Sequence, residues 1–201
     1  WEQKGDDIDG EAAVDQSGRS VSMNSTGTIV AIGAPYNNGN GSYSGHVRVY
    51  EYNDGTSQWE QKGDDIDGEV GGSWNGDKSG CSVSMNSAGT QVAIGADYND
   101  GNGSSSGHVR VYEYNDETSQ WGQLGEDIDG EAAGDSSGKP VSMNSAGTKV
   151  AIGAEYNDGN RGHVRVYEQV TLQSMIDAAA SSAGIDFYFE GLASTFALTE
   201  A

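Results

Sequence analysis

The fold of this chain is decided by residues 17–69, which read SGRSVSMNSTGTIVAIGAPYNNGNGSYSGHVRVYEYNDGTSQWEQKGDDIDGE. Near copies of this stretch follow at residues 79–131 and 137–168. A repeat of about 60 residues is longer than one coil of a solenoid and close to the length of one propeller blade. The sequence therefore predicts a blade-type repeat protein.

Composition limits the core and the partners. Only 34% of the 201 residues are hydrophobic and 31 are glycine, so we expect a thin core shared among short strands. The 31 Asp and Glu residues outweigh 10 Lys and Arg residues, which gives a net charge of −21. This charge repels nucleic acid and anionic lipid, and no apolar run is long enough to insert directly into a membrane. Divalent cations are the expected means of offsetting it.

Each unit predicts four short strands joined by turns. Valine and isoleucine share one face of V-A-I-G-A, and the valines of G-H-V-R-V-Y face away from its His, Arg and Tyr. The W-x-Q-x-G stretches that begin at Trp1, Trp59 and Trp121 fit exposed outer strands. The other predicted strands are residues 20–24, 82–86 and 141–144, then 29–34, 91–96 and 149–154, and then 46–50, 108–112 and 163–167.

The predicted fold class is all-β, with β-propeller blades of four antiparallel strands in three units, about 1–58, 59–120 and 121–168. Three blades are too few for a usual ring, so we expect an incomplete propeller or a part of a larger ring. Because open strand edges need covering, the expected partners include further repeats of the same chain or other copies of it. The chain begins inside a repeat, and we interpret it as a stretch of something longer.

The pattern G-x-S-V, V-A-I-G-A-P and S-G-H-V-R-V-Y resembles the FG-GAP repeats of integrin-α-type β-propellers, with the closest match at Ala31–Pro35. Asp97 and Glu155 replace the proline in the later units. The calcium loop of that family falls on residues 24–28 and their two copies, which contain no carboxylate. The metal residues of the family therefore do not carry over to this chain.

Residues 169–201 differ from the repeats. Apolar residues recur on one helical face between Thr171 and Ala183, and Gly184 follows as a C-cap, which predicts a helix. The stretches TLQSMIDAAASSAG and STFALTEA resemble the start of a fasciclin-like adhesion domain, although they cover only a small part of one.

The acidic segment D-I-D-G-E is the strongest candidate site. Carboxylates two residues apart, with a glycine for a sharp turn, match the oxygen ligands that Ca²⁺ prefers, while the alternative is a solvated acidic turn. Each segment is followed by a further Asp before the next S-G turn. The candidate metal ligands are Asp7, Asp9, Glu11, Asp15, Asp65, Asp67, Glu69, Asp77, Asp127, Asp129, Glu131 and Asp135.

Other polar residues receive structural interpretations. The three histidines, His46, His108 and His163, recur in one frame, whereas a catalytic site needs different residues that converge once, so we expect hydrogen bonds within the strands or to the acidic turns. The arginine two residues further along looks like a charge partner for those turns. N-D-G-N is typical of a hairpin turn, and Cys81 aligns with Arg19 and Lys139 and is an incidental thiol.

The sequence thus predicts a non-enzymatic extracellular adhesion or structural module, calcium-stabilised, that mediates protein–protein or surface assembly. Three sequons, at Asn24, Asn40 and Asn102, agree with a secreted glycoprotein. One alternative is a carbohydrate-binding propeller that uses tryptophans such as Trp74, which lies in an insertion unique to the second unit. Another alternative is a non-catalytic part of a larger secreted enzyme.

Overall fold

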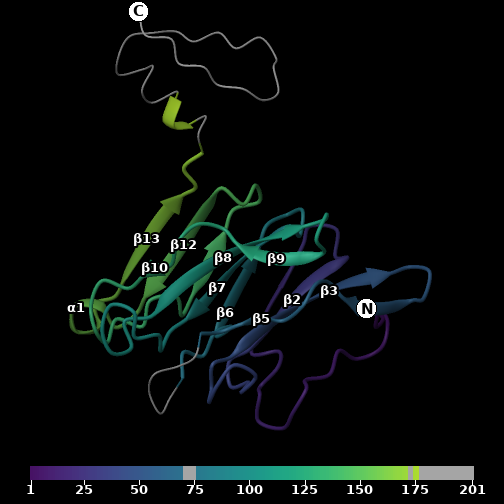
Figure 1. Ribbon diagram of the computed structural model, residues 1–201, viewed down its shortest axis with the longest axis horizontal. Helices are drawn as coiled ribbons and strands as arrows, with labels where there is room; N and C mark the ends of the chain where they lie inside the picture. The colour runs from purple at the N-terminus through teal and green to yellow at the C-terminus, as the bar shows by residue number, and fades with distance from the viewer. Residues whose placement is uncertain (70–75, 172–173, 177–201) are drawn as a thin grey trace, which may run out of the picture. The chain divides into compact units, whose positions relative to one another are not determined.

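The structure, a computed structural model, describes residues 1–69, 76–171 and 174–176. Antiparallel sheets make up nearly all of the regular secondary structure in the described chain, which confirms the all-β prediction (Figure 1). The chain divides into two compact units, Trp1–Glu168 and Gln169–Ala201, and each is considered by itself. None of the helices in the described parts is long and apolar enough to cross a membrane.

Three sheets follow one another in the first unit. The first contains β1 (Ser20–Met23), β2 (Ile29–Ala34), β3 (His46–Asn53), β4 (Gln58–Gln61) and β5 (Ile66–Asp67), in the order β1-β2-β3-β4 with β5 also paired to β3. The second repeats this order with β6 (Ser82–Met85), β7 (Gln91–Ala96), β8 (His108–Asn115), β9 (Gln120–Gln123) and β10 (Ile128–Asp129). The third contains β11 (Val141–Met143), β12 (Lys149–Ala154) and β13 (His163–Glu168), with the short helical turn α1 (Asn157–Asn160) before β13.

Asparagine shapes the first hairpin of each sheet. The Asn24 side-chain oxygen accepts hydrogen bonds from the backbone N–H groups of Thr28 (2.9 Å) and Ile29 (3.0 Å). Gly27 adopts a positive φ of 70°, which completes the tight reversal. Because Asn24 is 8% exposed and bonded within the turn, its sequon is not accessible in the folded chain.

The hydrophobic core lies between neighbouring sheets. Val47 and Val49 of β3 are fully buried against Val83 and Met85 of β6. Burial of such side chains contributes about 1.5–3 kcal/mol each. The junction is also hydrogen-bonded, since the Met85 N–H donates to the Ser22 hydroxyl oxygen (3.0 Å). At the next junction Val109 of β8 packs with Met143 and Ile152 of the third sheet.

The two outermost sheets leave matching faces uncovered. Val164 and Val166 of β13 are 68% and 67% exposed, although their counterparts in β3 are fully buried. Val21 and Met23 of β1 are 64% and 53% exposed, although their counterparts in β6 are buried. The described sheets therefore do not close into a ring.

The W-x-Q strand belongs to the sheet that precedes it in the chain. Trp59 of β4 pairs with Tyr52 of β3, and the two rings meet edge to face with centroids 5.2 Å apart. The Trp59 indole N–H also donates to the Lys4 carbonyl (2.8 Å). This position is packed at the sheet edge, and residues 1–5 form no strand in the described structure. Trp74 lies outside the described residues.

In the second unit, Ser174 and Thr171 cap one another. The Ser174 N–H donates to the Thr171 hydroxyl (3.1 Å), and the Thr171 N–H donates to the Ser174 hydroxyl (2.9 Å). Residues 174–176 are helical. The remainder of the predicted helix and the fasciclin-like stretch lie outside the described residues.

Candidate metal sites between acidic segments

The second and third acidic segments each span two sheets. Ile66 of β5 is 4% exposed and anchors one segment in the core. Before it, Asp65 approaches His46 of the first sheet, and after it Glu69 approaches His108 of the second sheet. A glycine is required at Gly68, because a Cβ there would lie 2.7 Å from the Ser79 Cβ.

The first cluster consists of Glu11, His46 and Asp65, whose ligand atoms all lie within 4.8 Å of one another. The His46 Nδ1 atom lies 3.4 Å from the Asp65 Oδ2 atom and 3.8 Å from the Glu11 Oε2 atom. The Glu and the Asp come from consecutive acidic segments. One imidazole nitrogen and two carboxylates thus face a common point, which is an arrangement that could hold a metal ion.

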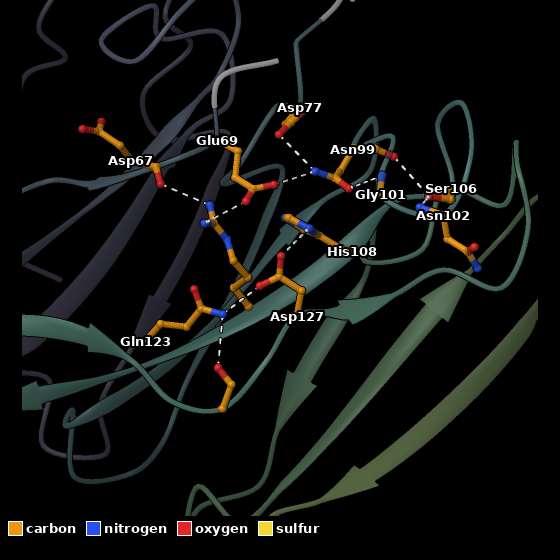
Figure 2. Close-up of polar contacts among 12 residues, drawn as sticks. Asp67, Glu69, Asp77, Asn99, Gly101, Asn102, Ser106, His108, Gln123 and Asp127 are labelled. Atoms are coloured by element: carbon orange, nitrogen blue, oxygen red, sulfur yellow. Dashed lines mark hydrogen bonds and ion pairs between the residues drawn. The ribbon is translucent and has the colours of Figure 1, made fainter. Parts of the chain in front are cut away.

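The second cluster, Glu69, His108 and Asp127, repeats this geometry. The His108 Nδ1 atom lies 3.5 Å from the Asp127 Oδ2 atom. Figure 2 shows Glu69 and Asp127 converging on His108 from different parts of the chain. The carboxylates of one segment therefore serve different sites, whereas the sequence predicted that they would converge on one ion.

The two histidines are buried and incompletely bonded. His46 is 2% exposed and His108 is 1% exposed, and neither Nδ1 atom has a hydrogen-bond partner among the described residues. Burial, together with the positive charge of Arg110, lowers the pKa of His108 to about 4. The imidazole is therefore neutral at pH 7, and a neutral imidazole nitrogen is the form that binds metals.

A glutamine holds each aspartate of the clusters. The Gln61 amide donates to the Asp65 Oδ1 atom (2.7 Å), and the Gln123 amide donates to the Asp127 Oδ1 atom (2.7 Å). This bond leaves the other carboxylate oxygen to face the histidine. Such an outer partner orients a ligand and is a regular part of metal sites.

Arginine fixes the backbone of each segment, as the sequence indicated. The Arg48 guanidinium donates to the Asp9 carbonyl (2.8 Å), and Arg110 donates to the Asp67 carbonyl (3.2 Å). Arg48 also lies 3.7 Å from the Glu11 carboxylate. The arginine therefore places the glutamate of the segment beside the histidine two residues earlier.

The last aspartate of each predicted set lies outside the clusters. The Asn99 amide donates to Asp77 (3.1 Å) and to Glu69 (3.1 Å), and burial raises the pKa of Asp77. The Asn99 side-chain oxygen also accepts from the Gly101 N–H (2.7 Å), which agrees with the predicted turn. Equivalent amide bonds reach Asp15 from Asn37 and Asp135 from Asn157.

The structure thus divides the predicted ligands. Glu11, Asp65, Glu69 and Asp127 enter the two complete clusters. Glu131 meets His163 alone, at 3.5 Å. Those that enter no cluster with other described residues are Asp7, Asp9, Asp15, Asp67, Asp77, Asp129 and Asp135.

Sequence reasoning missed the histidines as ligands. It expected each histidine to bond within its strand or to an acidic turn, and the folded chain brings carboxylates of two acidic segments to each of His46 and His108. A usable signal was the regular spacing of W-x-Q-x-x-x-D after the first two G-H-V-R-V-Y strands.

Comparisons with known proteins bear on the fold. No protein-family model matches the chain, and no curated protein matches it. A solved structure with a similar fold is that of a 6-phosphogluconolactonase-like protein from Bacteroides uniformis, with a TM-score of 0.53 and 13% identity. The match covers 82% of this chain and 39% of that protein.

The same comparison corrects one prediction. The sequence predicted a protein without enzymatic activity, because it contains no converging catalytic residues. The solved structure with the similar fold is named for an enzyme, a lactonase, which contradicts that prediction. At 13% identity the likeness itself concerns the fold.

Proposed function

We propose that this chain is a run of β-propeller blades that serves as an extracellular adhesion or structural module, with metal ions linking consecutive acidic segments. The observation that carries the proposal is the pair of Glu–His–Asp clusters, each built by two segments and a buried histidine. A metal ion there would join parts of the chain that no disulfide can join, since Cys81 is the only cysteine.

Charge and repetition support this function. A net charge of −21 opposes compaction, and bound cations would reduce that repulsion. A stiff row of sheets presents a long surface for partners, as in other repeat proteins. The resemblance of the units to FG-GAP repeats adds support for an adhesion or assembly role at a surface.

The donor set narrows the choice of ion. Calcium, which the acidic segments alone suggested, prefers six to eight oxygen ligands. An imidazole nitrogen with two carboxylates suits Zn²⁺ or a similar first-row ion, bound with an open position. We therefore propose Zn²⁺ as the preferred ion, with Ca²⁺ as the comparison.

Thermal unfolding of the full chain with Zn²⁺, Ca²⁺, Mg²⁺ and ionic-strength-matched NaCl tests the proposal. An ion at 100 times its Kd stabilises the folded state by about 2.7 kcal/mol per site. The double variant Asp65→Asn with Asp127→Asn should lose this response.

The matched control is Asp67→Asn with Asp129→Asn, which removes the same charge from the same segments outside the clusters. The control should keep the Zn²⁺ response. An equal stabilisation by all divalent ions, or an equal loss of the Zn²⁺ response in both double variants, would show that the ions act by general charge screening and not by binding to the clusters.

A second candidate function is favoured by the fold comparison. The chain could form part of a larger enzyme whose active site lies in further sheets, because it covers only 39% of the lactonase-like protein. Hydrolysis of 6-phosphogluconolactone by the natural gene product would support this candidate, and no turnover above the uncatalysed rate would remove it.

A further inference from the structure

We propose that His163 and Glu131 supply two of the three ligands of a zinc site and that Asp7 of a second copy of this chain supplies the third, so that copies join head to tail. The inference rests on the proposed function, because it assumes that the two internal clusters bind metal.

The pair of His163 and Glu131 repeats two of the three members of an internal cluster. The His163 Nδ1 atom lies 3.5 Å from the Glu131 Oε2 atom, and Arg165 donates to the Asp129 carbonyl (2.6 Å), as the other two arginines do in their segments. His163 has 26% of its side chain exposed, against 2% for His46. Among the described residues no aspartate takes the place that Asp65 and Asp127 take in the complete clusters.

Asp7 is held as those two aspartates are held. Residues 1–11 are identical in sequence to residues 59–69, so Asp7 corresponds to Asp65. The Gln3 amide donates to the Asp7 Oδ1 atom (2.9 Å), as Gln61 does to Asp65. Asp7 is exposed. Its Oδ2 atom corresponds to the oxygen with which Asp65 and Asp127 face a histidine in the complete clusters.

Asp7 and Glu11 of the first acidic segment do not compete for the same histidine. Glu11 already lies beside His46, whereas Asp7 meets no histidine among the described residues. In the middle of the chain, Asp65 and Glu69 of one segment serve two different histidines at once. Residues 1–11 can therefore bridge their own first sheet and the third sheet of another copy in the same manner.

The uncovered apolar faces fit this arrangement. Val164 and Val166 correspond to the residues of β3 that are buried against β6, and Val21 and Met23 correspond to the residues of β6 that bury them. The exposed face of β13 in one copy thus matches the exposed face of β1 in the next copy. A contact between these two faces would continue the sheet junctions that exist within the chain.

The pairing register follows from the internal examples. Ile66 pairs with Val47 and Asp67 pairs with His46. By the same register, Ile8 of the second copy would pair with Val164, and Asp9 would pair with His163. Such a head-to-tail contact is heterologous and closes only if the rotation allows. Two copies supply six sheets, within the four to eight blades of usual propellers.

Sedimentation of the full chain at micromolar concentration, with Zn²⁺ or with EDTA, tests the inference. We expect Zn²⁺ to promote association, and Asp7→Asn and His163→Asn each to weaken it by at least roughly tenfold. Asp116→Asn is the charge-matched control in an exposed turn and should associate like the unchanged chain.

Mixing the two impaired variants gives a sharper test. A chain with Asp7→Asn keeps an intact tail, and a chain with His163→Asn keeps an intact head, so their mixture should form dimers that contain one of each. A mixture that stays monomeric, or association that persists in EDTA and in Asp7→Asn, would overturn the inference.

Zinc titration separates this failure from failure of the proposed function. Monomeric Asp7→Asn should still bind two Zn²⁺ ions per chain at the internal clusters. Two ions bound without Zn²⁺-dependent association of the unchanged chain would refute the joining of copies alone. No bound zinc at all would refute both.

Discussion

Replacing Gly95 with alanine tests the spacing between the second and third sheets. Gly95 lies in β7, and a Cβ there would be 2.8 Å from the Gly138 carbonyl carbon and closer still to its oxygen. The obstacle is backbone, which cannot rotate away as a side chain can. The same Gly138 carbonyl accepts a hydrogen bond from the Ser82 hydroxyl, so a forced separation would also weaken that bond.

The expected loss follows from these two effects. Overpacking of a fitted contact costs about 1–3 kcal/mol, and a weakened hydrogen bond costs about 1 kcal/mol more. For a domain of this size, each kcal/mol lowers the melting temperature by about 2–4 °C. Gly95→Ala should therefore lower the melting temperature by about 4–16 °C.

Scanning calorimetry of the full chain in metal-free buffer is the measurement. The matched control is Gly122→Ala in β9, where a Cβ meets no atom of the described residues within 4 Å and the backbone is not left-handed. That variant should melt within about 2 °C of the unchanged chain. Equal melting of Gly95→Ala and Gly122→Ala would refute the close approach of the two sheets.

Two further predictions concern the second sheet. Asp97 is 7% exposed, and one of its carboxylate oxygens has no hydrogen-bond partner in the described parts of the chain. Burial raises the pKa of Asp97, so the folded state gains stability as the pH falls through that raised pKa and loses it as the pH rises. Asp97→Asn should thus raise the free energy of unfolding by about 1–3 kcal/mol at pH 7, with a smaller gain near pH 4 by urea unfolding, and a gain that grew toward acid pH would contradict the sign. Burial, with the charge of Asp97, also raises the pKa of the Cys81 thiol. Iodoacetamide should therefore modify Cys81 at least roughly tenfold more slowly in the folded chain than in urea, and equal rates would show that the thiol is not protected.

The strands were the most predictable part of the fold. Alternating and branched residues predicted β2, β7 and β12 with their observed bounds, because both faces of V-A-I-G-A enter the core between sheets. The His and Arg side chains on the polar face of β3 were expected to contact the acidic turns, and the structure shows in addition that His46 and Arg48 are buried there. Acidic segments from elsewhere in the chain pack on that face. The alternation of residues along a single strand does not indicate which other segments will pack on it.

The candidate site was predictable only in its residue type. The carboxylates of D-I-D-G-E were recognised as possible ligands, but the structure groups them across consecutive segments, together with a histidine, and not within one segment. Asp65 and Glu69 are separated by a buried isoleucine and by the turn at Gly68, which sends them to different histidines. The number of residues between two side chains indicates their distance in space only where the backbone between them does not turn.

The shared acidic segment bears on how such a chain grows. The repeat visible in the sequence begins at W-x-Q, yet its first strand completes the sheet before it, as β4 completes the first sheet. A tandem duplication of one sequence unit would therefore insert a new sheet together with both halves of a new Glu–His–Asp cluster. Lengthening by whole units preserves every internal cluster, whereas a deletion with ends inside a unit separates an aspartate from its histidine.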